Sequence, residues 1–504
     1  MRVSRRSFLK SSAAAGAAVA ASGGLVQNIL ASAPAMTPGP GNKWPGRVAI
    51  NFNKGAMTIK GTSPNFTHTL NEDIIRKMVD DTIKLLTGSS SIGEAWKSIF
   101  PSSLTATSKI AIKIPIGFND GPPAPHWASV KAITDGLQQM DLNGVKLPLG
   151  NITIYDMAGS GTFANAGYTS ANFPGITILK DNAVDGGNGA INNRTYAKTL
   201  RDADFLINVF SPRGHMVMTC SSTFTLGFKC HFGTYSNPSG LHGNGETSAA
   251  ATNLRDMNCT GPVYNKTVLS VCSGIYANWE GHGPSGGPDD YSKYANSIDP
   301  SISYLGTGSF RGPSTIMMST DPVAIEMQTV KMMRLNNSST TTPYPKTQVS
   351  TSGYATANMP TYLRASGGVT VSGLAGTTYN IGQIDESKME VRRIINDIVM
   401  VENHPDLGGA AAGANIIASP IKGHRGTFIE FRLPHDLAGH DAQIDLYDIK
   451  GALVRRHSQK VLGALNHFSW DNTDDSGKQV SLGAYIVRLT SGRIHLSTKF
   501  VTLR

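Results

Sequence analysis

Two periods of apolar and polar residues run along most of the chain, and each predicts one kind of element. Apolar residues at helical spacing follow Asn71 as far as Leu86, which predicts an amphipathic helix capped by Asn71. A second helical pattern covers about residues 127–140. Short apolar runs typical of buried strands separate and follow these helices. The predicted strands are 109–116, 151–155, 176–179, 205–209, 267–271, 315–318 and 394–401.

This alternation of strands and helices predicts an α/β fold. We expect a mostly parallel, Rossmann-like sheet layered with helices in a body that spans residues 45–401. Ligands of such sheets bind beyond the carboxyl ends of the strands. That rule singles out Asn119, Asp156 and Arg213, which stand at or just after the ends of predicted strands.

The pattern changes near residue 425. Short strand-like runs are separated there by turn sequences such as 448–451 (Asp-Ile-Lys-Gly) and 474–477 (Asp-Asp-Ser-Gly). Residues 425–504 are therefore predicted to form a small all-β, immunoglobulin-like sandwich. The Gly- and Ala-rich stretch 402–424 is predicted to be a linker. The expected tail strands are 427–433, 442–448, 453–457, 467–470, 483–489 and 495–503.

The first 35 residues have the character of an export signal. Residues 4–10 read Ser-Arg-Arg-Ser-Phe-Leu-Lys, a weakly apolar stretch follows, and Ala31-Ser32-Ala33 places small residues where a signal peptidase cuts. This order predicts a twin-arginine signal peptide over 1–35, with the twin-arginine export machinery as partner. The mature protein would reach the periplasm, the cell surface or the medium.

The composition excludes some classes of protein. The chain has 504 residues with 16% charged residues and a formal charge of +10, and the four cations of the signal account for part of that charge. Dense Lys/Arg blocks are absent from the sequence, so nucleic acid is not an expected partner. Long apolar runs are absent after the N-terminus, which excludes a multi-span membrane protein.

Two cation-x-His motifs, sixteen residues apart, carry the sharpest chemical signal: Arg213-x-His215 and Lys229-x-His231. Residues two apart in an extended segment project to one side, so each pair would aim a cation and an imidazole at the same space. A cation binds carboxylate or phosphate, and a neutral imidazole moves a proton. We therefore expect Arg213 and Lys229 to bind a small anionic ligand and His215 and His231 to be catalytic.

Four further residues are candidate ligand contacts. Lys113 interrupts an apolar strand, so it either faces a site inside the fold or faces solvent at a sheet edge. Asp156 is either a site carboxylate or a turn residue. Asn119 and His126 flank the loop after the Lys113 strand, and His126 is either a site residue or a helix cap.

Metal and thiol chemistry remain open. His242 lies eleven residues after His231, so His215, His231 and His242 could together hold a divalent metal, although their spacing matches no known ligand pattern. The cysteines, at 220, 230, 259 and 272, lack a C-x-x-C motif, so no iron–sulfur cluster is expected. Disulfides and buried thiols are both possible. A nucleophilic Cys230 is disfavoured, because adjacent strand residues face opposite sides.

The body resembles family 362 of the domains of unknown function, in its twin-arginine-exported branch. The matching stretches are 110–114, 152–156, 203–209, 213–215, 229–233 and 319–324. Arg213 stands where the family usually has Lys, and Cys230 stands where it usually has Asn. Some relatives carry ferredoxin-type clusters, whose cysteines this chain lacks. Asp321 and Pro322, in the last stretch, are expected to begin a helix as N-cap and first residue.

The tail resembles FlgD-like immunoglobulin modules and the C-terminal sorting domains of type IX secretion. The resemblance rests on 444–448, 470–477, 482–489 and the final strand around Lys499-Phe500-Val501. It implies sorting or attachment at the cell envelope, with sugar binding as the alternative.

Two functions follow for the whole chain. It is either an exported enzyme acting on a small anionic or carbohydrate-derived substrate, or a non-catalytic ligand-binding protein of the envelope or cell surface. A redox protein is the disfavoured third possibility.

Overall fold

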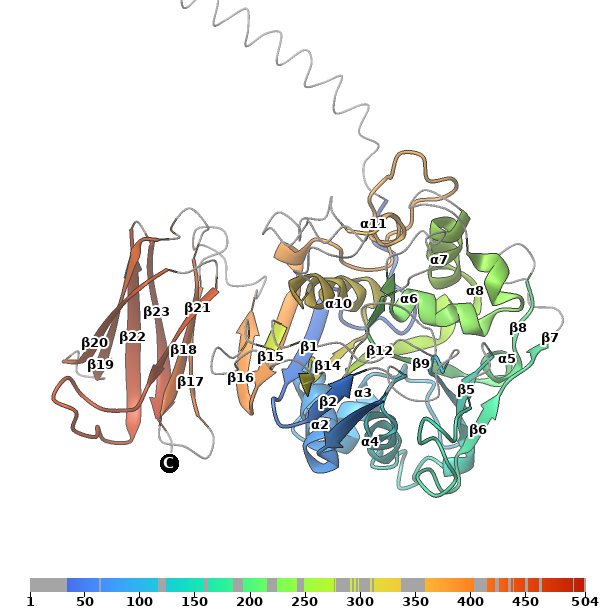
Figure 1. Ribbon diagram of the computed structural model, residues 1–504, viewed down its shortest axis with the longest axis horizontal. Coiled ribbons are helices and arrows are strands. Elements are labelled where there is room, and N and C mark those ends of the chain that lie inside the picture. The colour runs from blue at the N-terminus through green and yellow to red at the C-terminus, as the bar shows by residue number, and fades with distance from the viewer. Residues whose placement is uncertain are drawn as a thin grey trace, which may run out of the picture.

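The computed structural model describes most of the chain after the signal (Figure 1). The described residues are 34–502 except 63–64, 117–123, 158–161, 185–193, 215–223, 243–248, 276, 278–290, 292–293, 296–297, 299–308, 311, 337–358, 403–414, 422–425, 434–436, 438, 449–451, 462–464 and 493. Asn119, His215 and Cys220 lie outside these residues, and what the sequence indicates for them stays a prediction. Within the described ranges, no helix has the length and hydropathy that crossing a membrane requires.

A nine-stranded sheet forms the centre of the body. Its order is β16-β15-β1-β14-β12-β9-β4-β5-β6, and five of the eight neighbouring pairs are parallel. This confirms the α/β fold with a mostly parallel sheet. The strands are β1 (Arg47–Phe52), β4 (Ile110–Lys113), β5 (Ile152–Asp156), β6 (Thr177–Lys180), β9 (Phe205–Phe210), β12 (Thr267–Gly274), β14 (Thr315–Ser319), β15 (Glu390–Ile395) and β16 (Ile398–Glu402).

Helices cover both faces of this sheet, and the apolar side chains of each strand alternate between the two layers. Ile110 and Ile112 join the core beneath α2 (Glu72–Thr87), α3 (Ile92–Ser98) and α4 (Trp127–Leu137), whereas Ala111 joins the opposite core. Asn71 caps α2 as predicted, accepting a hydrogen bond from the backbone N–H of Ile74 at 3.1 Å. The opposite layer holds α5 (Lys198–Asp202), α6 (Gly227–Cys230), α7 (Ala249–Cys259), α8 (Gly261–Lys266), α10 (Pro322–Asn336) and α11 (Thr361–Ser366).

Small elements complete the body. A three-stranded sheet joins β13 (Ser309–Phe310), β2 (Met57–Thr62) and β3 (Asn65–Leu70), and two short ribbons pair β7 (Ala183–Val184) with β8 (Tyr196–Ala197) and β10 (Arg213–Gly214) with β11 (Phe224–Thr225). The 3₁₀ turns are η1 (Leu149–Asn151), η2 (His231–Thr234), η3 (Pro238–Leu241) and η6 (Glu386–Lys388).

The single strand predicted at 394–401 is part of a hairpin. β15 and β16 pair antiparallel around Asn396 and Asp397, whose φ angles are 46° and 74°. Positive φ at both central positions is the geometry of a tight type I′ turn, which Asn and Asp tolerate. The apolar residues on both sides of this two-residue turn made the hairpin look like one strand.

The tail is a sandwich of two antiparallel sheets, as predicted. One sheet is β17 (Asn415–Pro420), β18 (Thr427–Arg432) and β21 (Leu465–Trp470), and the other is β20 (Leu453–Lys460), β19 (Asp441–Asp448), β22 (Gly483–Ser491) and β23 (Ile494–Thr502). The sandwich has its own hydrophobic core between the two sheets, to which Trp470 and Val487 belong. β17 corrects the predicted linker, because 415–420 pairs along its whole length with β18 and so belongs to the sandwich.

Candidate functional site

The carboxyl ends of β4 and β9 meet where the sheet changes its direction of growth. From β4 the chain adds β5 and β6 on one side, and it later adds β9 and β12 on the other. In open α/β sheets, such a switch point is where ligands bind. We therefore expect a ligand-binding site among the residues at these strand ends.

A row of polar side chains crosses the sheet at this level. The pairing register aligns Tyr155, Lys113, Asn208, Ser270 and Ser319 across β5, β4, β9, β12 and β14. All five are buried. Inner positions of a sheet covered on both faces are usually apolar, so this row is not explained by packing alone.

Lys113 and Asp156 form an ion pair inside the body. The ammonium of Lys113 lies 3.0 Å from Asp156 Oδ1, and the two side chains are only 0% and 2% exposed. Asp156 Oδ2 also accepts a hydrogen bond from the backbone N–H of Ile116 at 2.8 Å, and Lys113 donates to the Ile114 carbonyl at 3.2 Å. Lys113 thus takes the inward of its two predicted orientations, and Asp156 is its partner.

Arg213 joins the end of β9 to the end of β4. Its side chain is 1% exposed, and it donates to the Pro115 carbonyl and, through Nε, to Ser211 Oγ at 3.2 Å. The charge of Arg213 acts on the Cys230 thiol, as does that of Lys113. The structure therefore brings Lys113 to the same buried region as Asp156 and Arg213, the two described residues that the strand-end rule singles out.

The segment that carries Cys230 and His231 is helical, which corrects the extended geometry considered for the second cation-x-His motif. α6 continues into η2, and residues two apart on a helix point about 200° away from each other. Lys229 places its ammonium 5.3 Å from the centre of the Phe232 ring. Lys229 and His231 consequently do not project from one side of a strand.

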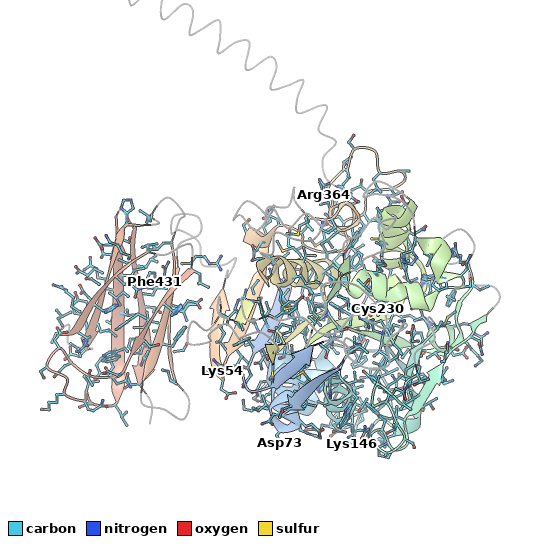
Figure 2. All side chains as sticks on the ribbon, in the orientation of Figure 1. Lys54, Asp73, Lys146, Cys230, Arg364 and Phe431 are labelled. Atoms are coloured by element: carbon cyan, nitrogen blue, oxygen red, sulfur yellow. The ribbon has the colours of Figure 1, made fainter. Side chains whose placement is uncertain are left out.

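The same helical turn brings Cys230 to the ion pair. Cys230, the last residue of α6, has its Sγ 3.7 Å from Lys113 Nζ, and Figure 2 shows Cys230 inside the body. Burial raises the pKa of this thiol to about 11, although the positive charges of Lys113 and Arg213 act in the opposite direction. Cys230 is therefore a protonated thiol at neutral pH, and its environment does not activate it as a nucleophile.

His231 is held neutral and anchored through one ring nitrogen. Burial, and then the charge of Lys113, lower its pKa well below the usual value of 6.5. Its Nδ1 lies 3.1 Å from Thr234 Oγ1, which in turn lies 3.4 Å from the hydroxyl of Tyr155. A neutral imidazole can accept or donate a proton.

Three buried side chains fix the start of α6. Asn208 Nδ2 donates to the Gly227 carbonyl at 2.9 Å, and Asn258 Nδ2 donates to the Phe228 carbonyl at 3.1 Å. Glu326, on α10, accepts from the backbone N–H of Phe228 at 3.3 Å and from the Tyr362 hydroxyl at 2.8 Å. α6 and its Cys230 and His231 are thus oriented by contacts from β9, α7 and α10.

The remaining candidates have other positions. His126 caps α4, since its Nδ1 accepts from the backbone N–H of Ala128 at 3.2 Å. His242 contacts the Phe232 ring edge-on, with ring centres 4.8 Å apart. Asp321 caps α10 as predicted, accepting from the N–H groups of Val323 and Ala324 at 2.9 Å.

Neither a metal site nor a disulfide is present in the part of the chain that the structure describes. No three His, Cys, Asp or Glu side chains gather there in a way that could hold a metal. Of the candidate triad His215, His231 and His242, His215 lies outside the described ranges. Cys230, Cys259 and Cys272 are buried free thiols.

Sequence reasoning missed Asn208, Tyr155 and Glu326. Asn208 interrupts the apolar run 205–209 in the same way that Lys113 interrupts its own strand, so the same signal could have identified it. Tyr155 is expected from the sequence only as the last residue of the strand 151–155. Glu326 carries no sequence signal of its own, since it occupies one position of an ordinary helix.

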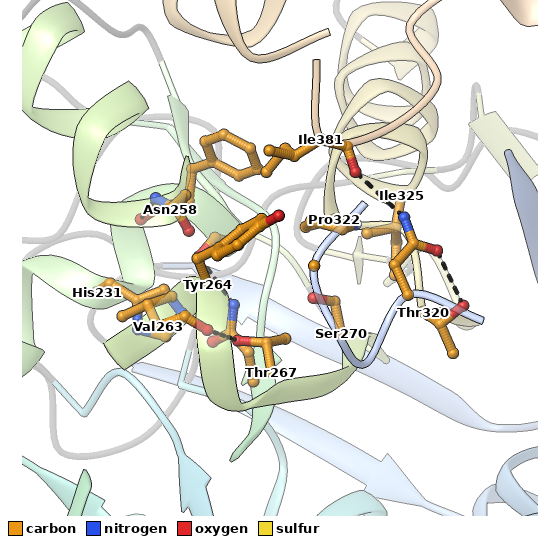
Figure 3. Close-up of a pocket in the computed structure, with 15 residues that line it drawn as sticks. His231, Asn258, Val263, Tyr264, Thr267, Ser270, Thr320, Pro322, Ile325 and Ile381 are labelled. Carbon is orange, nitrogen blue, oxygen red and sulfur yellow. Dashed lines mark hydrogen bonds between the residues drawn. The ribbon is translucent and has the colours of Figure 1, made fainter. Parts of the chain in front are cut away.

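A small cavity adjoins His231 beneath α6 (Figure 3). Its free volume is about 20 Å³. Figure 3 shows His231 and Val263 on one side and Thr320 and Ile325 on the other. Asn208 and Ser270, from the polar row, also line it, together with Gly39 and Asn42 of the segment that precedes β1.

The sequence comparisons find two matches. Residues 110–331 match the domain of unknown function DUF362, and residues 2–22 match the signal sequence of the twin-arginine translocation pathway. A comparison with curated proteins found no match.

The structural neighbours cover small parts of this chain. Dimeric latent PorU from Porphyromonas gingivalis is 16% identical over 21% of this chain, with a TM-score of 0.17. PorZ, a surface component of the type IX secretion system of the same organism, is 18% identical over 21%, with a TM-score of 0.14. The alignments span 11% and 14% of those two proteins. The sensor domain of the anti-sigma factor RsgI4 in Pseudobacteroides cellulosolvens is 12% identical over 19% of this chain and 100% of its own length, with a TM-score of 0.13.

The signal sequence indicates export across the membrane by the twin-arginine machinery. The matched family segment contains the ends of β4, β5 and β9 and the whole of α6. The protein is thus an exported protein with a DUF362 domain, and that domain holds Lys113, Asp156, Arg213, Cys230 and His231.

Proposed function

We propose that the DUF362 domain binds a small anionic ligand at the carboxyl ends of β4, β5 and β9. Lys113 and Arg213 supply the positive charge, and His231 is the group that exchanges a proton with the ligand. The observation that carries the proposal is the buried Lys113–Asp156 pair at the switch point, with Arg213 beside it.

The electrostatics of the region support an anion. Removing a charged side chain from water is costly, and a fold keeps such groups inside mainly where they are paired or used. Two buried cations contact the same strand end, one through Ile114 and the other through Pro115. In a region of low dielectric constant, both would attract a carboxylate or phosphate more strongly than they would in water.

Ligand binding is testable on the mature protein with inorganic phosphate and acetate as probes. We expect phosphate to raise the melting temperature of the wild type and to bind measurably by calorimetry. The variant Arg213→Gln should lose this response. Lys109→Gln is the matched control, because Lys109 precedes β4 at its opposite end and is exposed. Binding that survives in Arg213→Gln would contradict the proposal.

A second variant distinguishes loss of the binding site from misfolding of the protein. In the double variant Lys113→Met/Asp156→Leu, apolar side chains replace the buried pair, which often preserves stability. We expect this variant to fold, by circular dichroism, and to bind phosphate more weakly than the wild type. A folded double variant with unchanged affinity for phosphate would show that Lys113 does not contribute to the binding site.

Substitution of His231 distinguishes a catalytic domain from one that only binds a ligand. If the domain is catalytic, His231→Gln should abolish turnover of an anionic substrate while the affinity for phosphate changes little. If it only binds ligands, this variant should behave like the wild type in every binding assay. The neutral state of His231 supports proton transfer, and so favours the enzyme.

We further propose that the sandwich of residues 415–502 sorts or attaches the protein at the cell envelope. Support comes from the sequence resemblance to FlgD-like and type IX sorting modules and from the two-sheet architecture. In a host with a type IX system, fusing this segment to a periplasmic reporter should move the reporter to the surface. A reporter that stays periplasmic would contradict sorting.

A further inference from the structure

The cavity beneath α6 contains an unsatisfied hydrogen-bond acceptor. Asn208 is 3% exposed, and its Oδ1 has no hydrogen-bond partner among the described residues. The assignment of the amide is fixed by its other end, since Nδ2 donates to the Gly227 carbonyl, which can only accept. A buried oxygen left without a donor destabilises the fold, so such an atom needs an explanation.

Two other polar groups face the same space. Ser270, next to Asn208 in the polar row, lines the cavity. His231 also lines it. The ring of His231 uses Nδ1 for Thr234, so Nε2 is the ring nitrogen that remains for a second hydrogen bond.

The size of the cavity restricts what can occupy it. A buried water needs at least roughly 10–15 Å³ of free volume and usually makes about three hydrogen bonds. The free volume here is about 20 Å³, and Asn208, Ser270 and His231 provide three polar partners. This space accepts one small O–H group and is too small for a whole substrate.

We propose that this cavity is a binding site for a single O–H donor. The donor hydrogen-bonds Oδ1 of Asn208 and contacts the hydroxyl of Ser270 and Nε2 of His231. In the ligand-free protein it is a bound water. When a ligand is present, the same position takes either that water or a hydroxyl of the ligand.

One consequence rests on the proposed function. If His231 exchanges a proton with an anionic ligand, the bound O–H group is its second hydrogen-bond partner, on the side away from Thr234. Asn208 and Ser270 then act as positioning residues for that group. The binding site itself does not depend on this role.

A crystal structure of the mature protein at about 1.5 Å resolution tests the site directly. We expect a spherical density peak about 2.6–3.2 Å from Asn208 Oδ1. A connected, elongated peak would identify the hydroxyl of a co-purified ligand. An empty cavity, or an Asn208 whose Oδ1 accepts from a protein group, would overturn the proposal.

Two substitutions at one position provide the matched comparison. Ser270→Ala keeps the space and should retain the density, whereas Ser270→Val fills the space and should remove it. Circular dichroism and thermal melting check that both variants fold. Density that is lost in Ser270→Ala but kept in Ser270→Val would contradict the assignment.

The catalytic consequence has its own readout. Ser270→Val should shift the pH profile of any turnover relative to Ser270→Ala, in which the bound O–H group is retained. A wild-type protein that does not bind phosphate would refute the proposed function. That result would not affect the proposed O–H site. An unchanged pH profile, with the density gone, would refute the proton-transfer role alone.

Discussion

Lys113 and Asp156 show at the scale of single residues how a buried charge limits what the sequence can tolerate. Each side chain is nearly inaccessible to water, and each depends on the other and on backbone groups at the ends of β4 and β5. Breaking a buried pair leaves one charge uncompensated, which costs more than the pair itself contributes.

Lys113→Met should therefore lower the free energy of unfolding by about 3–5 kcal/mol. The double variant Lys113→Met/Asp156→Leu should regain most of that loss, because no charge is then left unpaired. Urea denaturation of the wild type, the single variant and the double variant measures both values. A single variant as stable as the wild type would show that the pair is not buried in solution.

Glu326 predicts a pH-dependent contribution to stability. Burial raises its pKa from 4.5 to about 7, although hydrogen bonds from Tyr362 and from the backbone of Phe228 and Gly227 favour the charged form. Between these values the folded protein holds a proton that the unfolded chain has released. The contribution is therefore complete below about pH 4.5 and is lost as the pH rises through about 7.

Comparison with Glu326→Gln isolates this effect, because the other titrating groups are common to both proteins. The difference in unfolding free energy between wild type and variant should change by about 2–3 kcal/mol from pH 5 to pH 8. Urea denaturation at several pH values measures it. Parallel stability curves for the two proteins would mean that Glu326 keeps an ordinary pKa.

At the scale of elements, the sequence was most informative where hydrophobic periodicity alone decides the structure. The helix after Asn71 buries one face and the strand at 205–209 buries both, so burial of apolar side chains dominates the energetics of each. The structure of the segment around Cys230 was harder to predict from the sequence. Its four-residue helix begins with Gly227 and is held by Asn208, Asn258 and Glu326, which come from three distant parts of the chain.

This difference explains the mixed result for the candidate site. Asp156 and Arg213 follow from strand ends and Lys113 from its place inside an apolar strand, and periodicity places strands well. The position of Cys230 beside Lys113 depends on tertiary contacts, and local sequence does not encode those. Treating the segment as extended therefore separated Cys230 from the site, whereas the helix brings its thiol to 3.7 Å from the ammonium.

The segment before β1 allows a prediction about close packing. It is fastened to distant elements: Thr37 donates to the Asn380 carbonyl at 2.7 Å, and the hydroxyl of Tyr264 donates to the Thr37 carbonyl at 3.0 Å. Gly41 lies so close to β12 that a Cβ there would be 2.0 Å from the Thr267 carbonyl oxygen. Real side chains do not tolerate such a contact, so the backbone would have to move.

Gly41→Ala should lower the free energy of unfolding by about 1–3 kcal/mol, because the segment must shift away from β12. Gly150→Ala is the control, since a Cβ at Gly150 meets nothing within 4 Å. Thermal melting of both variants gives the comparison. Equal melting temperatures would show that this segment is not packed against β12 as described.

At the scale of the whole molecule, the described apolar residues divide into cores that belong to different parts of the chain. Two clusters lie on the two faces of the nine-stranded sheet, and a third lies inside the tail sandwich and includes Phe431 and Leu446. No residue of the third cluster lies before Ile416. A part of the chain with its own core can fold as a separate cooperative unit.

Removing residues 403–504 should therefore leave the body intact. We expect the full-length mature protein to show two unfolding transitions in calorimetry and the truncated protein to keep one of them at an unchanged temperature. Phosphate should shift only this retained transition, because Lys113, Arg213 and His231 all belong to the body. A truncated protein that does not fold, or a ligand-dependent shift of the transition that truncation removes, would mean that the sandwich is part of the binding unit. In that case the proposed division between ligand binding and envelope attachment would be wrong.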